Sequence, residues 1–84
     1  MYDLLLERRA EADLKRLAAK QFERVMRQIM SLAENPRPAG CRKIVRSKSD
    51  WRLRVGDYRV IYEIDQTAMA VRVMRVRRRR EAYL

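Results

Sequence analysis

The sequence predicts an α+β fold in which two N-terminal helices pack on a small, twisted, antiparallel-rich sheet. Three observations predict it: a helical repeat of apolar residues in the first part of the chain, a two-residue turn between β-rich runs in the second half, and an apolar strand near the C-terminus. A chain of 84 residues suits a single domain over residues 1–84. Its apolar fraction of 48% favours a folded protein over a disordered basic tail.

The first 34 residues predict one short strand followed by helices. Tyr2–Leu6 is the expected strand. From Arg9 to Ala33 apolar residues recur at helical spacing between charged ones, and no Gly or Pro interrupts them. One long helix is an alternative, but a second helix that folds back would cover more of the sheet. We therefore expect a helical hairpin that breaks near Lys20.

A loop and two further strands are expected after the helices. Asn35–Gly40 (NPRPAG) should form the loop, because each proline disfavours helix at the preceding residue. Cys41–Val45 is expected to be a strand and Arg46–Asp50 a basic connection. Ala70–Val76 is nearly continuous apolar sequence, which suits a central strand. Cys41 is the single cysteine, so no internal disulfide can form, and we expect it to be a small core residue.

A β-hairpin is predicted by the segment WRLRVGDYRVIYEI, residues 51–64, in which Gly-Asp forms the turn. The register expected from that turn places these residues opposite one another: Val55 and Tyr58, Leu53 and Val60, Trp51 and Tyr62. One face is then apolar and belongs to the core. The other face carries Arg52, Arg54, Arg59 and Ile61, with Arg54 directly opposite Arg59. Opposed like charges are destabilising, so an anion is the expected compensator; a solvated sheet face is the alternative.

The charge of the chain is strongly positive and unevenly distributed. The net charge is +10; residues 1–34 hold seven basic and six acidic residues, whereas residues 35–84 hold fourteen basic and five acidic ones. The second half is therefore expected to face nucleic acid, an acidic protein or, less favoured, anionic lipid. No apolar run has the length of a membrane span, and the N-terminus lacks the apolar core of a signal peptide. A cytoplasmic protein without membrane contact is expected.

Few residue types are available for catalysis. The chain has no His, one Cys, two Gly and scattered carboxylates, so neither a metal site nor a cofactor is expected. Arginines can hold a phosphate by paired hydrogen bonds and stabilise a phosphoryl transition state. RNA supplies its own nucleophile, the 2′-hydroxyl. Arg77–Arg80 and Tyr83 could join such a site; a solvated tail and a packed terminal residue are the alternatives.

The hairpin, the strand VRVMRV, the ending RRREAY, and the segments RAEADLKRL and NPRP together resemble the RelE toxins of bacterial and archaeal toxin–antitoxin systems. The resemblance covers nearly the whole chain. It implies the RelE-like microbial RNase fold and a ribosome-dependent endoribonuclease, an mRNA interferase that cleaves mRNA in the A site without metal and so inhibits translation. It also implies an acidic, RelB-like antitoxin that covers the basic surface in a hetero-oligomeric complex.

The resemblance also implies site residues. The catalytic set would be Arg54, Arg59, Arg78 and Tyr83. Arg52 and Arg79 also follow from the resemblance, and with the other basic residues of the second half they make up the predicted RNA-binding set: Arg52, Lys43, Arg46, Lys48, Arg77, Arg79 and Arg80. Many relatives carry Gly-His-Arg where Arg77–Arg79 stand here, so the family histidine is absent and reduced activity is expected. Arginine is a poor base, which leaves Tyr83, Lys43 and Lys48 as candidates for the general base.

A non-catalytic binding module is the alternative function. It would be either a ParE-like inhibitor of DNA gyrase or a decayed toxin that only binds its antitoxin. The missing histidine favours this alternative, whereas the arginines of the hairpin and Tyr83 favour the nuclease.

Overall fold

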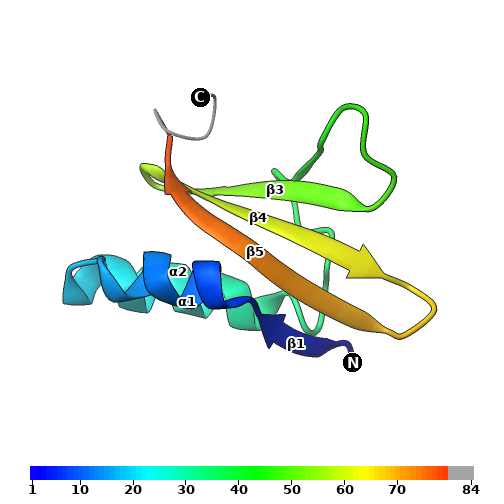
Figure 1. The fold of residues 1–84 in the computed structure, drawn as a ribbon, viewed down its shortest axis with the longest axis horizontal. Helices are drawn as coiled ribbons and strands as arrows, with labels where there is room; N and C mark the ends of the chain where they lie inside the picture. The colour runs from blue at the N-terminus through cyan, green and yellow to red at the C-terminus, as the bar shows by residue number, and fades with distance from the viewer. Residues whose placement is uncertain (80–84) are drawn as a thin grey trace.

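The computed structural model describes residues 1–79, which contain two helices and a five-stranded mixed sheet (Figure 1). The elements in chain order are β1 (Asp3–Leu6), α1 (Arg8–Lys15), α2 (Ala19–Ser31), β2 (Arg42–Lys43), β3 (Asp50–Val55), β4 (Tyr58–Asp65) and β5 (Ala70–Arg78). The strand order is β1-β5-β4-β3-β2. β1 runs parallel to β5, and the other three pairs are antiparallel. The predicted α+β class and its antiparallel-rich sheet are confirmed.

The helices form the predicted hairpin and lie on one side of the sheet (Figure 1). α1 contacts β5, whereas α2 contacts β3 and β4. The break, predicted near Lys20, lies at residues 16–18, because Arg16 and Leu17 close the last turn of α1 through their N–H groups and Ala18 is extended. No Gly or Pro marks this break, which is why the sequence placed it only approximately.

The core lies between the helices and the covered face of the sheet. Within residues 1–79, thirteen apolar residues form it: Ala10, Leu14, Val25, Ile29, Leu32, Leu53, Val55, Val60, Tyr62, Ile64, Val71, Val73 and Val76. The helical residues recur every three or four positions and the strand residues mostly at every second position, as burial of a single face requires. Cys41 is half-buried and packs against this core, so it lies at the core's margin and not inside it as expected.

The segment after the loop is less regular than expected. The predicted strand Cys41–Val45 is reduced to Arg42–Lys43. The chain then turns, because the N–H of Ile44 donates to the Asp50 carbonyl and Arg46 adopts a positive φ of 72°. These contacts depend on the position of β3 and cannot be read from local sequence. The Asn35–Gly40 loop is present as predicted.

The predicted hairpin register is confirmed at each position. Val55 lies opposite Tyr58, Leu53 opposite Val60, Arg54 opposite Arg59 and Trp51 opposite Tyr62. Gly56, the first residue of the turn, has a positive φ of 59°, which glycine adopts without strain. Ala70–Val76 lies inside β5, between β1 and β4, as expected of a central strand.

Candidate functional site

Three arginines lie in register across neighbouring strands on the face of the sheet away from the helices. Arg59 of β4 lies opposite Arg54 of β3 and opposite Arg77 of β5. Directly opposite Cα atoms in an antiparallel pair are about 5 Å apart, so the three backbone positions span about 10 Å. We call this set the arginine row. It confirms the predicted opposition of Arg54 and Arg59 and adds Arg77 from β5.

A second row on the same face lies next to the arginine row. Arg52 of β3 is opposite Ile61 and Arg42, and Ile61 is in turn opposite Arg75. Arg42 was not among the residues predicted for the site. Alternation along β2 could have indicated it, but a strand of two residues gives almost no periodic signal.

The positive charge of this face is concentrated at the end close to the hairpin turn. In the third row, Glu63 lies opposite Arg72 and forms an ion pair with it at 3.5 Å. In the arginine row the strand partners are themselves arginines. Arg59 is only 8% exposed, so its charge acts in a lower dielectric than that of exposed Arg54. The Nε of Arg54 donates to the Gly56 carbonyl at 3.2 Å, which ties this side chain to the turn.

The other predicted residues of β5 and β2 have different placements. Arg78 lies opposite Tyr58, which places its position on the helix side of the sheet, where it lines a hollow of about 240 Å³ with Asp13 and Arg16. The N–H of Arg79 donates to the Asp57 carbonyl at 2.7 Å, so Arg79 adjoins the hairpin turn. Lys43 lies opposite Trp51, in register with the covered face.

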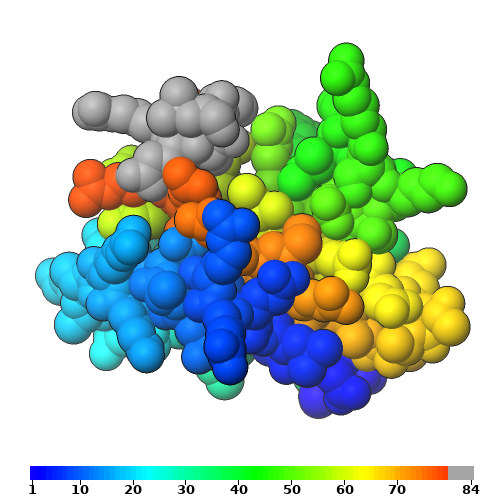
Figure 2. Space-filling view, viewed as in Figure 1, coloured from blue at the N-terminus to red at the C-terminus, as the bar shows by residue number. Residues whose placement is uncertain are grey.

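Two predicted RNA-binding residues lie in a projecting loop between β2 and β3. Arg46 and Lys48 are exposed between β2 and β3. Figure 2 shows this green segment standing out from the body of the molecule. Arg80 and Tyr83 lie outside the described residues. The structure therefore brings Arg52, Arg54, Arg59 and Arg77 together on one face and separates Lys43 and Arg78 from it.

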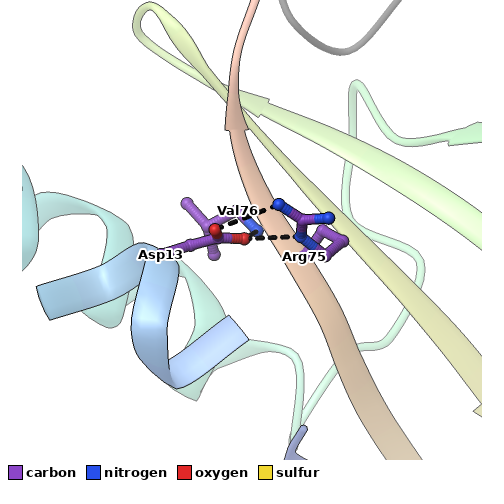
Figure 3. Close-up of polar contacts among 3 residues, drawn as sticks. All are labelled: Asp13, Arg75 and Val76. Carbon is purple, nitrogen blue, oxygen red and sulfur yellow. Dashed lines mark hydrogen bonds and ion pairs between the residues drawn. The ribbon is translucent and has the colours of Figure 1, made fainter. Parts of the chain in front are cut away.

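One carboxylate is built into the boundary between α1 and β5 (Figure 3). Asp13 is 8% exposed; its Oδ2 accepts hydrogen bonds from Arg75 Nε at 2.8 Å and from the Val76 N–H at 2.9 Å. Its Oδ1 accepts a third from the Arg75 guanidinium at 3.2 Å. Burial acts to raise the pKa of Asp13, but these hydrogen bonds and the charges of Arg75 and Arg77 outweigh burial and lower it.

The face of the sheet away from the helices, here called the open face, is suited to holding phosphates and offers little for proton transfer. Several guanidinium groups in line can bind successive phosphates and neutralise negative charge that develops at phosphorus. Arginine stays protonated and cannot act as an ordinary base. Among residues 1–79, no three acidic, thiol or imidazole side chains lie close enough together to hold a metal ion.

The chain matches a known toxin family over nearly its whole length. The family model described as "ParE toxin of type II toxin-antitoxin system, parDE" matches residues 4–83. No curated protein sequence matches the chain. In the described part, no helix is both long enough and apolar enough to cross a membrane.

Several solved toxin structures share the fold. The toxin of the E. coli RelBE complex has a TM-score of 0.81 at 21% identity, over 93% of this chain and 96% of that one. The Pyrococcus horikoshii RelE–RelB complex gives 0.83 at 22%, covering 93% and 94% of the two chains. RelBE2 from Mycobacterium tuberculosis gives 0.81 at 24%, covering 92% and 96%. The expected RelE-like fold is confirmed, and the chain belongs to the ParE toxin family of type II toxin–antitoxin systems, within the RelE/ParE superfamily.

Proposed function

We propose that this toxin is a ribosome-dependent endoribonuclease that cleaves mRNA in the A site of cytoplasmic ribosomes and so stops translation. The observation that carries the proposal is the arginine row. Arg54, Arg59 and Arg77 come from three strands and share one level of the open face, although like charges placed directly opposite one another are unfavourable in a sheet. A polyanion that binds along this face would offset that cost.

The row supports a mechanism that needs no metal. The RNA 2′-hydroxyl attacks the neighbouring phosphorus, the 5′-oxygen of the next nucleotide leaves, and a cyclic phosphate forms. Arg59 and Arg54 would hold the scissile phosphate and stabilise the charge of the transition state. Arg52, Arg77 and Arg79 would hold neighbouring phosphates, while Arg78 would contribute from the helix side.

Proton transfer needs a residue other than arginine. Tyr83, by the resemblance to RelE, would stack on a base or exchange a proton. Lys48 lies in the projecting loop and Lys43 in register with the covered face, so neither shares the ladder of the arginine row. An enzyme with this composition would rely mainly on positioning and charge stabilisation, which fits an mRNA already held in line by the ribosome.

A cognate antitoxin is the expected protein partner. The E. coli, P. horikoshii and M. tuberculosis structures are complexes of toxin and antitoxin. For this chain we propose an acidic, RelB-like antitoxin whose amphipathic segment covers the arginine row in a hetero-oligomer.

The test uses ribosomes stalled on a defined mRNA, with primer extension to map new 5′ ends. The purified chain is compared with Arg54→Ala, Arg59→Lys and, as a matched control, Arg9→Ala, which removes an exposed arginine from α1. Cleavage in the A-site codon that is lost in the first two variants and kept in the third supports the proposal. No cleavage by the folded wild-type chain rejects it.

Inhibition of DNA gyrase is the second candidate function. The matching family model is that of ParE toxins, and the family histidine of the RNA-cutting relatives is absent here. A supercoiling assay with purified gyrase separates the two candidates. Inhibition of supercoiling together with intact mRNA would support the gyrase inhibitor and reject the nuclease.

A further inference from the structure

β5 contains a β-bulge, at which the alternation of its side chains between the two faces of the sheet is reversed. Val73 and Arg75 pair with consecutive residues of β4, so Met74 between them is an extra residue. One extra residue reverses the alternation of side chains in the rest of the strand. Val73 and Val76 are therefore both buried against the helices, and Arg77 is placed on the opposite face.

This bulge decides whether the arginine row has two members or three. If Met74 were paired like its neighbours, the rest of β5 would shift by one residue. Val76 would then lie opposite Arg59, and Arg77 would lie opposite Tyr58 on the helix side. The arginine row therefore depends on the bulge of β5 at Met74. This bulge lies between the part of β5 that pairs with β1, which ends at Val73, and Arg77.

Asp13 binds the two residues that follow the extra one. β1 ends at Leu6 and pairs with β5 only as far as Val73. Beyond that point, α1 brings Asp13 to the same edge, where its carboxylate accepts from the Val76 N–H and from two nitrogens of Arg75 (Figure 3). One buried side chain thus occupies the place along β5 that a longer β1 would have filled.

We propose that Asp13 is a positioning residue that fixes the bulge of β5 and thereby holds Arg77 in the arginine row. Burial of Val76 favours the same register, so the core and the carboxylate act together. Without Asp13 the end of β5 exchanges between the observed register and the shifted one. The effect on RNA cleavage rests on the proposed function, whereas the effect on register does not.

Disulfide trapping measures the register directly, in a chain carrying Cys41→Ser. The pair Arg59→Cys and Arg77→Cys reports the observed register, because directly opposite positions satisfy disulfide geometry. The pair Arg59→Cys and Val76→Cys reports the shifted register, because these positions lie directly opposite each other only in that register. In the observed register they face opposite sides of the sheet. With Asp13 present, the first pair is expected to oxidise readily and the second slowly. Asp13→Ala should slow the first by about tenfold and accelerate the second.

Two milder variants keep the test decisive if Asp13→Ala does not fold. Asp13→Asn retains an acceptor for the Val76 N–H but loses the charge that holds Arg75, and Arg75→Gln removes the other half of that pair. Both should shift trapping in the same direction by a smaller factor. Unchanged trapping in both of these variants, with a folded circular dichroism spectrum, would overturn the proposal.

Cleavage provides a second readout in chains without the engineered cysteines, so that Arg59 is kept. Asp13→Asn and Arg77→Ala should each lower the cleavage rate, and the double variant should be no slower than Arg77→Ala alone, because both act through the same residue. Additive losses would count against the positioning role. A change in register with no cleavage by any chain, wild type included, would retain the inference about Asp13 and reject the proposed nuclease.

Discussion

The Tyr62 hydroxyl donates a 2.8 Å hydrogen bond to the carbonyl of Pro36, joining the centre of the sheet to the loop that follows α2. Tyr62 is fully buried and belongs to the core, while Pro36 lies in the segment that separates helices from strands. This bond therefore helps to hold the loop against the covered face of the sheet.

We expect Tyr62→Phe to lower the free energy of unfolding by about 1–2 kcal/mol, because a buried carbonyl loses its donor. Urea unfolding at neutral pH measures the change, and Tyr58→Phe, at the margin of the open hollow, is the matched control. Burial raises the pKa of Tyr62, so the contribution of the phenol is full below about pH 10 and declines above it. Equal losses for both variants would contradict this account.

Asp13 should make stability depend on pH in the acid range. Its pKa is lowered in the folded state, so its contribution is full above about pH 4 and is lost as the pH falls through the folded-state value. We expect Asp13→Asn to cost about 2 kcal/mol at pH 7, as hydrogen bonds to charged groups typically contribute. The free energies of unfolding of the wild type and of Asp13→Asn, measured between pH 7 and pH 2, should approach each other below pH 4. A difference that stays constant with pH would exclude the carboxylate as its source.

Gly56→Ala should destabilise the hairpin turn by about 1–2 kcal/mol, because residues with a Cβ are strained at positive φ. A Cβ there would also lie 2.9 Å from the Arg24 guanidinium, which is the mobile end of a long side chain. Gly40→Ala is the control: its φ is 91° and nothing lies within 4 Å of the added Cβ. Thermal unfolding should give similar losses for both. A much larger loss at Gly56, relieved by Arg24→Ala, would assign the cost to the contact instead.

Arg77 and Arg78 are adjacent in sequence but are placed on opposite faces of β5, which makes them a matched pair. If the proposed function holds, Arg77→Ala should reduce cleavage on programmed ribosomes by about 10–100-fold. The reason is the loss of one charge-assisted contact, which is worth about 1.5–3 kcal/mol. Arg78→Ala should have the smaller effect. The reverse order would return the main role to Arg78 and move the reactive surface towards the helix side.

Association with an acidic antitoxin should slow as salt is added, because the charge of the open face steers the encounter. Stopped-flow rates between 50 and 500 mM salt measure the dependence. Arg54→Ala with Arg77→Ala should lower the rate and flatten its slope, while Arg9→Ala should leave it nearly unchanged. A rate independent of salt would exclude steering by this surface.

The sequence predicted the hairpin well because its information is local. The Gly56–Asp57 turn fixes which residues face each other, and alternation of apolar and charged side chains then assigns both faces. The opposition of Arg54 and Arg59 follows from these two facts alone. The two helices and the loop after them were predicted for the same reason, since helical spacing and prolines act within a few residues.

The tertiary structure decided which residues of β5 and β2 join that face. Alternation read along β5 without its bulge assigns Arg77 to the wrong side, and β2 is too short to indicate Arg42. The bulge is held by contacts of Asp13 with Arg75 and Val76, which follow it by 62 and 63 positions in the chain. The sequence by itself determined the class of fold, the hairpin and the basic character of its open face. Only the tertiary structure decided the third member of the arginine row, through burial of Val76 in the core and packing of α1 against the edge of β5. The register of β5 depends on these long-range contacts, which no local pattern records.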